Sequence, residues 1–208
     1  TPPSLAIRMV IASIEQAPAA NVVFDPATGA GVFLAYYILL NKEVNSVIGV
    51  EIDPKTAELA EKLLSYVSAY VERSVNITVV CDNFFDYFDK VRGSLQVDSI
   101  IMNPPYGSVK FLASDLTDVS TKANMPDEQI ADLSSKLRQR TIDYSAKLRK
   151  QFAGTGMGTG TLEYSKLFMT AAFDLITTQG VIVAITPSSW LGDETSTAFR
   201  KNVVSNGW

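Results

Sequence analysis

Short apolar runs alternate with helical stretches along most of the chain, and this alternation constrains the fold more than any other feature. The expected strands are 21–25, 46–51, 76–81, 97–102 and 181–186, and the expected helices are 4–16, 31–41, 55–71, 163–178 and 194–204. Strands that alternate with helices indicate an α/β fold with a parallel sheet covered on both faces. Ligands of such sheets bind beyond the carboxyl ends of the strands, at the topological switch point.

A glycine-rich turn follows the first expected strand. The strand ends at Asp25, and Pro26-Ala27-Thr28-Gly29-Ala30-Gly31 leads into the next helix. Glycines at such a turn permit tight geometry and close approach of the backbone to a ligand. The spacing is not the complete dinucleotide fingerprint, because no third glycine follows three residues after Gly31. The next strand ends at Glu51, and an acid about 20 positions after the turn holds ribose hydroxyls in Rossmann-type sites.

The fourth expected strand runs into Asn103-Pro104-Pro105-Tyr106. Two consecutive prolines exclude both helix and ladder pairing, so the chain leaves the strand as a stiff, extended segment. The side-chain oxygen of Asn103 and the carbonyl of Pro104 then become two fixed acceptors near an aromatic ring. That arrangement suits a planar group that carries an NH2. A strand followed by a rigid turn is the alternative interpretation.

The composition excludes several kinds of chemistry. The chain has no histidine, which rules out His-based triads, HExxH metal sites and zinc deaminases, and we expect no metal. The single cysteine, Cys81, cannot form an internal disulfide, so a reducing compartment is expected and Cys81 is expected to be buried. No apolar run approaches the length of a membrane span, and the start Thr1-Pro2-Pro3 does not resemble a signal peptide.

Taken together, these segments resemble the class I S-adenosylmethionine-dependent methyltransferases. The closest resemblance is to the N6-adenine DNA methyltransferases of restriction–modification systems whose cofactor motifs precede the catalytic motif. The matching segments are 1–3, 25–34, 49–54, 81–85, 103–107, 164–168 and 180–187. The resemblance implies a Rossmann-like, doubly wound, mostly parallel sheet with strand order 3-2-1-4-5, whose last strands are expected to be absent.

The resemblance also implies that S-adenosylmethionine is the cofactor. The residues implied to bind it are Thr1, Asp25, Ala27, Gly29, Gly31, Glu51, Ile52, Asp82, Asn83 and Phe84. Asp25 and the glycine turn would cradle the methionine part, Glu51 would bind the ribose, and Ile52 would pack on the adenine. Asp82 would accept from the adenine amine, and Phe84 would add further packing. Taken without the motifs, Ile52 is equally well a core residue, and Phe33 and Phe84 are more often core residues than ligand contacts. Asp82 has the alternative of a turn residue at a strand end.

The implied reaction is methyl transfer to the N6 amine of an adenine that has left the DNA stack. The catalytic residues would be Asn103, Pro104, Pro105 and Tyr106. The Asn103 side-chain oxygen and the Pro104 carbonyl would accept the two amine hydrogens, and Tyr106 would stack on the base. The methyl donor is already activated, so positioning and preorganised acceptors can supply most of the rate.

The net charge of −4 argues against strong DNA binding by this chain alone. The chain begins without Met at a motif that in the resembled family follows earlier sequence, and it ends where that family's pattern continues. We therefore expect residues 1–208 to be a truncated catalytic domain with an insertion at about 108–162 and no target-recognition domain. Double-stranded DNA would bind mainly through that absent region. A restriction or specificity subunit, or a fused nuclease, is the further expected partner. The resemblance places the protein in the cytoplasm of a bacterium or archaeon, with no membrane partner.

Within the insertion, apolar residues recur at near-helical spacing between Ile130 and Leu148, and residues 136–150 are strongly basic. This stretch would contact DNA phosphates, cover the active site, or simply be a solvated helix face. The alternating glycines of 154–160 follow it without the Lys-Ser/Thr of a P-loop, which indicates a hinge.

Two other functions stay open from the sequence. A protein-glutamine N5-methyltransferase would share the Asn-Pro-Pro-Tyr motif, because an amide NH2 is also planar. The start Thr1-Pro2-Pro3 and the Asp25-Pro26 form of the glycine turn are closer to the DNA enzymes. The second alternative is a non-catalytic S-adenosylmethionine-binding module of a larger restriction assembly.

Overall fold

The computed structural model describes residues 1–110, 126–156, 160–192 and 194–205. These residues form two compact units. The first unit is Thr1–Pro105 with Phe168–Asp193, and the second is Tyr106–Leu167 with Glu194–Trp208. The predicted insertion and the predicted glycine hinge both belong to the second unit, and each lies partly outside the described residues.

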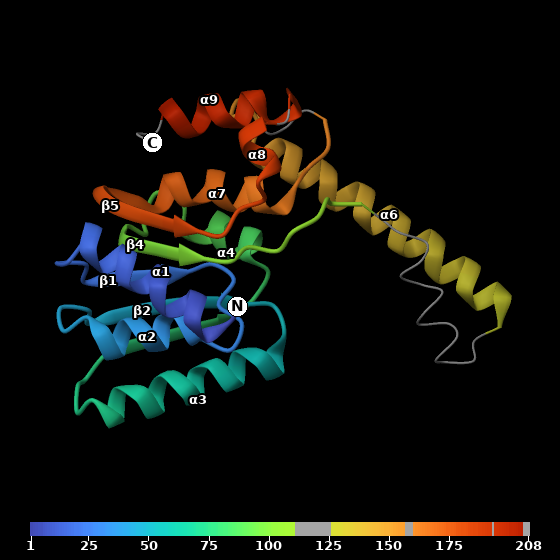
Figure 1. Ribbon diagram of the computed structural model, residues 1–208. Coiled ribbons are helices and arrows are strands. Elements are labelled where there is room, and N and C mark those ends of the chain that lie inside the picture. The colour runs from blue at the N-terminus through green and yellow to red at the C-terminus, as the bar shows by residue number, and fades with distance from the viewer. Residues whose placement is uncertain (111–125, 157–159, 193, 206–208) are drawn as a thin grey trace. The chain divides into compact units, whose positions relative to one another are not determined.

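The first unit is built on a five-stranded parallel sheet (Figure 1). Its strands are β1 (Val22–Asp25), β2 (Ser46–Glu51), β3 (Asn76–Cys81), β4 (Val97–Met102) and β5 (Ile176–Ala184). The spatial order is β3-β2-β1-β4-β5, and every pairing is parallel. This confirms the predicted fold class and strand order. Because β1 and β4 are neighbours, the ends that carry Asp25 and Asn103 lie side by side at the switch point.

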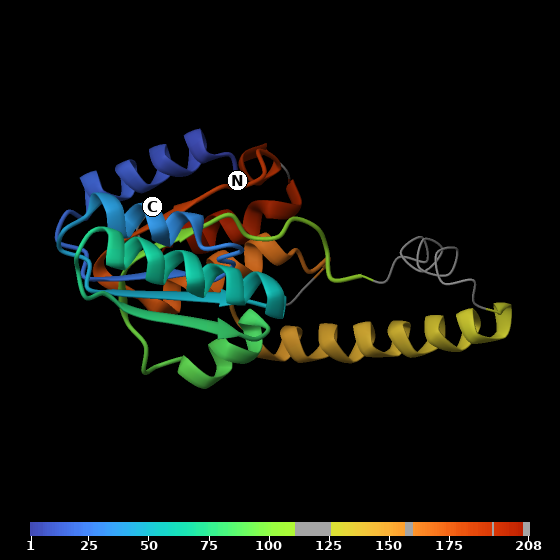
Figure 2. The same cartoon turned by 90° about the horizontal axis from the view of Figure 1, so that it is seen from below.

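Helices cover both faces of this sheet. The helices are α1 (Pro3–Gln16), α2 (Val32–Leu40), α3 (Pro54–Tyr70), α4 (Phe84–Val91), α7 (Tyr164–Leu175) and the short α8 (Ser189–Gly192). Figure 2 shows α1, α2 and α3 on one face and α4 on the other. The side chain of Val23 points into the first layer, where it joins a core formed with α1 and α2. Phe24 points to the opposite face and packs near Phe84 of α4. Alternate side chains of β1 therefore pack against the helices on the two faces of the sheet.

A buried hydrogen-bonded group of three hydroxyls fixes β4 to the helices of one face. Ser99 of β4 lies 2.8 Å from the hydroxyls of both Ser13 in α1 and Tyr37 in α2, and Tyr37 donates to Ser13. All three residues are buried, and burial raises the pKa of Tyr37 above its ordinary value. Each of the three hydroxyls therefore has a hydrogen-bond partner, and these bonds hold β4, the strand that leads to Asn103, in a single register.

Three sequence expectations need correction. Helix α4 was not predicted, although Asn83 caps it by accepting from the backbone N–H of Phe85. Helix α7 ends at Leu175, and β5 begins at once instead of at residue 181. Cys81 is exposed and not buried, because it ends β3, which is an edge strand of the sheet.

The second unit contains the long helix α6 (Asp127–Gln151), a 3-10 turn at Glu194–Ser196 and α9 (Thr197–Ser205). Helix α6 confirms the helical spacing seen at 130–148. The segment after Tyr106 pairs with residues 162–164, since Val109 donates to Leu162 and Tyr164 donates to Gly107. No helix in the described part of the chain is both long and apolar enough to cross a membrane.

Candidate functional site

A cavity of about 270 Å³ opens at the carboxyl edge of the sheet in the first unit. It is lined by Thr1, Ala27, Thr28, Gly29, Ala30, Val32, Phe33 and Asn103. The amino terminus, the glycine turn and the first residue of the Asn-Pro-Pro-Tyr motif therefore share one cavity. Four of the predicted site residues, Thr1, Ala27, Gly29 and Asn103, are brought together here.

The glycine turn has a geometry that other residues adopt only under strain. Gly29 and Gly31 have φ values of +53° and +83°, in the left-handed region. A Cβ on Gly31 would also lie 3.3 Å from Ala60 of α3. Gly31 is the N-cap of α2, so this residue lets the helix begin close against α3. The amino end of α2, with its unpaired backbone N–H groups, is thus turned toward the cavity.

Glu51, at the end of β2, is tied to the glycine turn. Its Oε2 accepts from the backbone N–H of Gly29 at 3.0 Å, and its Oε1 accepts from that of Asp53 at 2.9 Å. Asp53 in turn caps α3 by accepting from Thr56, with Pro54 at the first helical position. The carboxylate is therefore held in one orientation at the strand end.

Asp25 is the buried acid of this edge. It is fully buried, and its Oδ1 accepts from the backbone N–H of Ala27 at 3.1 Å. Its Oδ2 is buried with no hydrogen-bond partner among the described residues. Desolvation by burial, together with the nearby charge of Glu51 and against the Ala27 hydrogen bond, raises the pKa of Asp25 from 3.8 to about 7. Asp25 does not itself line the cavity, but Ala27 and Thr28, which follow it in the turn, do. A buried carboxyl with a raised pKa next to such a turn is typical of a functional site.

Asn103 leaves the end of β4 and faces the same cavity. Its Nδ2 donates to the hydroxyl of Thr1 at 3.0 Å. Thr1 makes no side-chain cap to α1, which starts after Pro2. The hydrogen bond to Thr1 holds the Asn103 amide in place at the end of β4.

The predicted adenine contacts lie at neighbouring strand ends. Ile52 follows β2 and is 66% exposed, which excludes the alternative that it is a core residue. Asp82 follows β3, and its two oxygens accept from Lys90 Nζ at 2.6 Å and from the backbone N–H of Asn83 at 2.8 Å. Phe84 is buried and belongs to an aromatic core cluster. Its ring centroid lies 4.5 Å from that of Phe168 and 5.3 Å from that of Phe85.

The Asn-Pro-Pro-Tyr motif spans the boundary of the two units. Pro104 is buried and Pro105 is exposed, and both belong to the first unit. Tyr106 begins the second unit, and its ring is 52% exposed. Partial burial raises the pKa of its hydroxyl above the ordinary value, so it is neutral at physiological pH. An exposed, neutral aromatic ring follows directly after the two prolines.

Sequence reasoning missed several residues that line the cavity. Thr28, Ala30, Val32 and Phe33 lie in or just after the glycine turn and contribute their side chains to its wall. Their position in the sequence could have indicated this role, because residues at a strand-to-helix turn of this kind lie at the edge of the sheet where ligands bind. Among the described residues, no group of three or more His, Cys, Asp or Glu side chains could hold a metal ion.

The parallel sheet, its strand order and the cavity at the switch point define the class I methyltransferase fold, and solved structures share it. One, from Listeria monocytogenes, is described as a class I S-adenosylmethionine-dependent methyltransferase, and the match has a TM-score of 0.63 at 16% identity. It covers 99% of this chain and 51% of that one. Another is the methyltransferase subunit of a type I restriction–modification system from Streptococcus thermophilus, with a TM-score of 0.64 at 16% identity. That match covers 99% of this chain and 38% of the subunit.

The family follows from the sequence itself. Residues 45–207 match the family model described as Eco57I restriction-modification methylase, and the chain belongs to this family. S-adenosylmethionine is the cofactor that the family and the fold imply. No curated protein matches the chain. The chain spans about half the length of one of these solved structures and 38% of the other.

Proposed function

We propose that this chain transfers a methyl group from S-adenosylmethionine to the N6 amine of an adenine flipped out of DNA, as the catalytic domain of a modification methyltransferase. One observation carries the proposal. Asn103, the residue assigned to the substrate amine, lines the same cavity as the glycine turn assigned to the cofactor. The two groups that must react would therefore meet within one small space.

The residues at this edge fit the cofactor. The turn at Gly29 suits close approach of its amino-acid end, and the carboxyl of Asp25 would attract the ammonium group of that end. The cavity of about 270 Å³ falls just below the range of roughly 300–1,000 Å³ typical of small-molecule pockets, so it would hold only part of the molecule. The nucleoside would lie on the open edge outside, with its ribose at Glu51 and its adenine on the exposed side chain of Ile52.

Several residues assigned to the cofactor site would act by holding other residues in place. Asp82 would accept from the adenine amine while Lys90 holds its carboxylate in place. Asn83 caps α4 and so fixes the turn that carries Asp82. Ala27 donates its backbone N–H to Asp25. Phe84 packs in the core, so we assign it to supporting this turn rather than to contact with the cofactor.

The chemical step needs no metal and no histidine in this proposal. S-adenosylmethionine, when bound, supplies an electrophilic methyl group on a sulfonium. Asn103 Oδ1 and the Pro104 carbonyl would accept the two hydrogens of the target amine, which directs the nitrogen lone pair toward that methyl group. As the N–C bond forms, the S–C bond breaks to leave a neutral thioether, and the methylated amine releases one proton to solvent. Thr1 positions Asn103 by accepting from its Nδ2. Tyr106 would stack on the flipped base, and Pro105 keeps the motif extended.

Replacing Asn103 tests this assignment. In the complete product of the gene that encodes this chain, Asn103→Ala should abolish methylation of DNA and leave the Kd for S-adenosylmethionine nearly unchanged. Asn76→Ala, at the exposed amino end of β3, is the matched control and should change neither. Near wild-type methylation by Asn103→Ala would show that the motif does not carry the reaction. Transfer to a glutamine side chain of a protein, with none to DNA, would replace adenine by the rival substrate.

A further inference from the structure

Helix α6 carries a strong separation of charge. Residues 136–150 contain six cationic side chains and one acid, Asp143, whereas the whole chain has a net charge of −4. Residues 127–135 of the same helix contain three acids and no cation. The Lys136–Asp132 ion pair, at 2.7 Å, lies at the junction of these two halves. Positive charge is therefore concentrated in the carboxyl-terminal part of α6.

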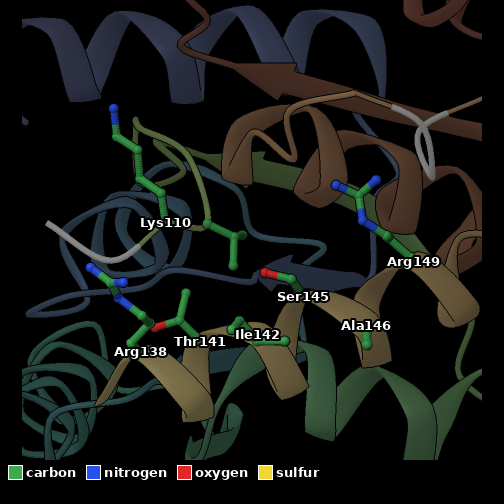
Figure 3. A pocket seen from close by; sticks show the side chains of 8 residues that line it. Lys110, Arg138, Thr141, Ile142, Ser145, Ala146 and Arg149 are labelled. Atoms are coloured by element: carbon green, nitrogen blue, oxygen red, sulfur yellow. The ribbon is translucent and has the colours of Figure 1, made fainter. Parts of the chain in front are cut away.

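Part of this charge faces a groove within the second unit. The groove has a volume of about 550 Å³ and is lined by Val109, Lys110, Arg138, Thr141, Ile142, Ser145, Ala146 and Arg149. The spacing of the six α6 residues places them on one face of the helix. Figure 3 shows Arg138 and Arg149 toward the two ends, with Thr141, Ile142 and Ser145 between them and Lys110 on the facing segment.

The facing wall of the groove is fixed in place and lies close to Tyr106 along the chain. Val109 donates to the carbonyl of Leu162 at 2.8 Å, and Ser108 forms an antiparallel bridge with Glu163. Lys110 follows Tyr106 by four residues, which can span at most about 14 Å even when fully extended. The Lys110 end of the groove therefore lies within about 14 Å of the backbone of Tyr106, whose ring is assigned to the target base.

The length of the groove and its side chains suit the sugar–phosphate backbone of one nucleic-acid strand. Arg138 and Arg149 are separated by eleven residues, or about 16 Å along the helix, which matches the axial length of about five phosphates of one DNA strand. The Arg149 guanidinium is oriented by a 2.8 Å hydrogen bond from its Nη2 to the carbonyl of Gly160. Between the cations lies Ile142, a large apolar side chain that is 55% exposed, with the Ser145 hydroxyl one turn away. The cationic side chains at the two ends of the groove suit phosphates, and the apolar and hydroxyl side chains between them suit the sugars.

We propose that this groove binds the sugar–phosphate backbone of DNA, next to the target base, through Arg138, Arg149 and Lys110. The contact is independent of sequence, so it positions the strand and leaves base recognition to other residues. The choice of DNA as the polyanion rests on the proposed function, whereas the groove and its charges do not.

Anisotropy of a labelled duplex of about 20 base pairs and arbitrary sequence tests the proposal, with the 208-residue chain and no cofactor. With three phosphate contacts, the affinity should fall roughly 40-fold between 50 and 200 mM NaCl. Arg138→Gln/Arg149→Gln leaves one contact, so the affinity should fall only about fourfold over the same range, from a much weaker starting value. Arg138→Lys/Arg149→Lys keeps both charges and should retain the steep dependence, which separates lost charge from lost folding.

The matched control removes the same number of charges from the other side of the helix. At about 100° per residue, Lys136 and Lys147 lie roughly 160–180° around α6 from the groove. Lys136→Gln/Lys147→Gln should keep the affinity within about twofold. Equal losses in the two pairs of substitutions would overturn the proposal, as would no binding at 50 mM NaCl or displacement by inorganic phosphate at equal ionic strength. Tighter binding of a duplex RNA of the same sequence would overturn the choice of DNA.

The assay separates this proposal from the proposed function. It involves neither cofactor nor methyl transfer, so failure of either of those leaves its result unaffected. If the groove pair loses DNA affinity while the Kd for S-adenosylmethionine stays unchanged, the groove is a separate site. If DNA binding persists and Asn103→Ala still methylates DNA, the catalytic assignment fails and the groove remains.

Discussion

The buried carboxyl of Asp25 should make the unfolding free energy depend on pH in a specific way. Its pKa is about 7 in the folded chain and 3.8 in the absence of burial. The folded state therefore binds an extra proton between these two values, and the stability this provides is lost as pH rises through 7. At 1.36 kcal/mol per pKa unit, the full difference corresponds to about 4 kcal/mol. Because the side chain is fully buried, little of this is screened by solvent.

Asp25→Asn should remove this dependence while keeping the acceptor for the Ala27 N–H. Between pH 5 and pH 8, the wild-type chain should lose about 2.5 kcal/mol relative to the variant. Urea unfolding followed by circular dichroism at pH 5, 6, 7 and 8 measures the difference. Glu61→Gln, at an exposed site on α3, controls for the loss of one carboxylate. Parallel pH curves for wild type and Asp25→Asn would refute the argument, because they would mean that Asp25 is not perturbed by burial.

Three further substitutions test the cofactor and base contacts. Glu51→Gln should weaken S-adenosylmethionine binding roughly tenfold to a hundredfold in calorimetry, because a charge-assisted hydrogen bond is worth about 1.5–3 kcal/mol. Glu58→Gln, on the exposed face of α3, is the control and should leave the cofactor affinity unchanged. Ile52→Ala removes three carbons, and if the adenine covers about half of the side chain, the loss of cofactor affinity should be about 1 kcal/mol at about 0.8 kcal/mol per buried CH2. An equal loss in Leu59→Ala, at another exposed site, would count against a specific contact. Tyr106→Ala should lose about 1–3 kcal/mol of stacking, which lowers the rate of DNA methylation roughly 5- to 150-fold. Tyr106→Phe keeps the ring and should stay near the wild-type rate.

Much of the sheet could be predicted from local pattern. The bounds of β2, β3 and β4 were predicted to the residue, because each is a short apolar run bounded by polar or turn residues. The start of β5 could not be predicted in this way. Its first residue, Ile176, pairs with Val97, and the register then shifts before Ser99 pairs with Val181. Such an irregularity depends on long-range pairing, which a local pattern does not encode.

Gly180 shows what made that irregularity possible. A Cβ at this position would lie 2.6 Å from the side chain of Ile176 and 3.0 Å from the carbonyl of Asp98. Only glycine permits the close approach. From the sequence alone, Gly180 is typical of the end of one element and the start of the next, so the strand was predicted to begin after it.

The candidate site was predictable where chemistry follows directly from position. Asp25, Gly29, Glu51 and Asn103 all stand at strand ends, and parallel pairing brings those ends to one edge. The burial of each side chain was not predictable. Ile52 and Phe84 looked alike as apolar residues near motifs, yet Ile52 is exposed and Phe84 is in the core. Helix α4 explains the difference, because it turns Phe84 inward against Phe168.

The most direct test of the central claim is the identity of the methylated atom. The complete gene product is incubated with methyl-labelled S-adenosylmethionine, duplex DNA and cell protein, and the label is then located by mass spectrometry of nucleosides and peptides. We predict label on N6-methyladenine in the DNA, lost in Asn103→Ala and retained in Asn76→Ala. Label on cytosine, on a glutamine side chain, or on adenine in equal amount with Asn103→Ala would contradict it.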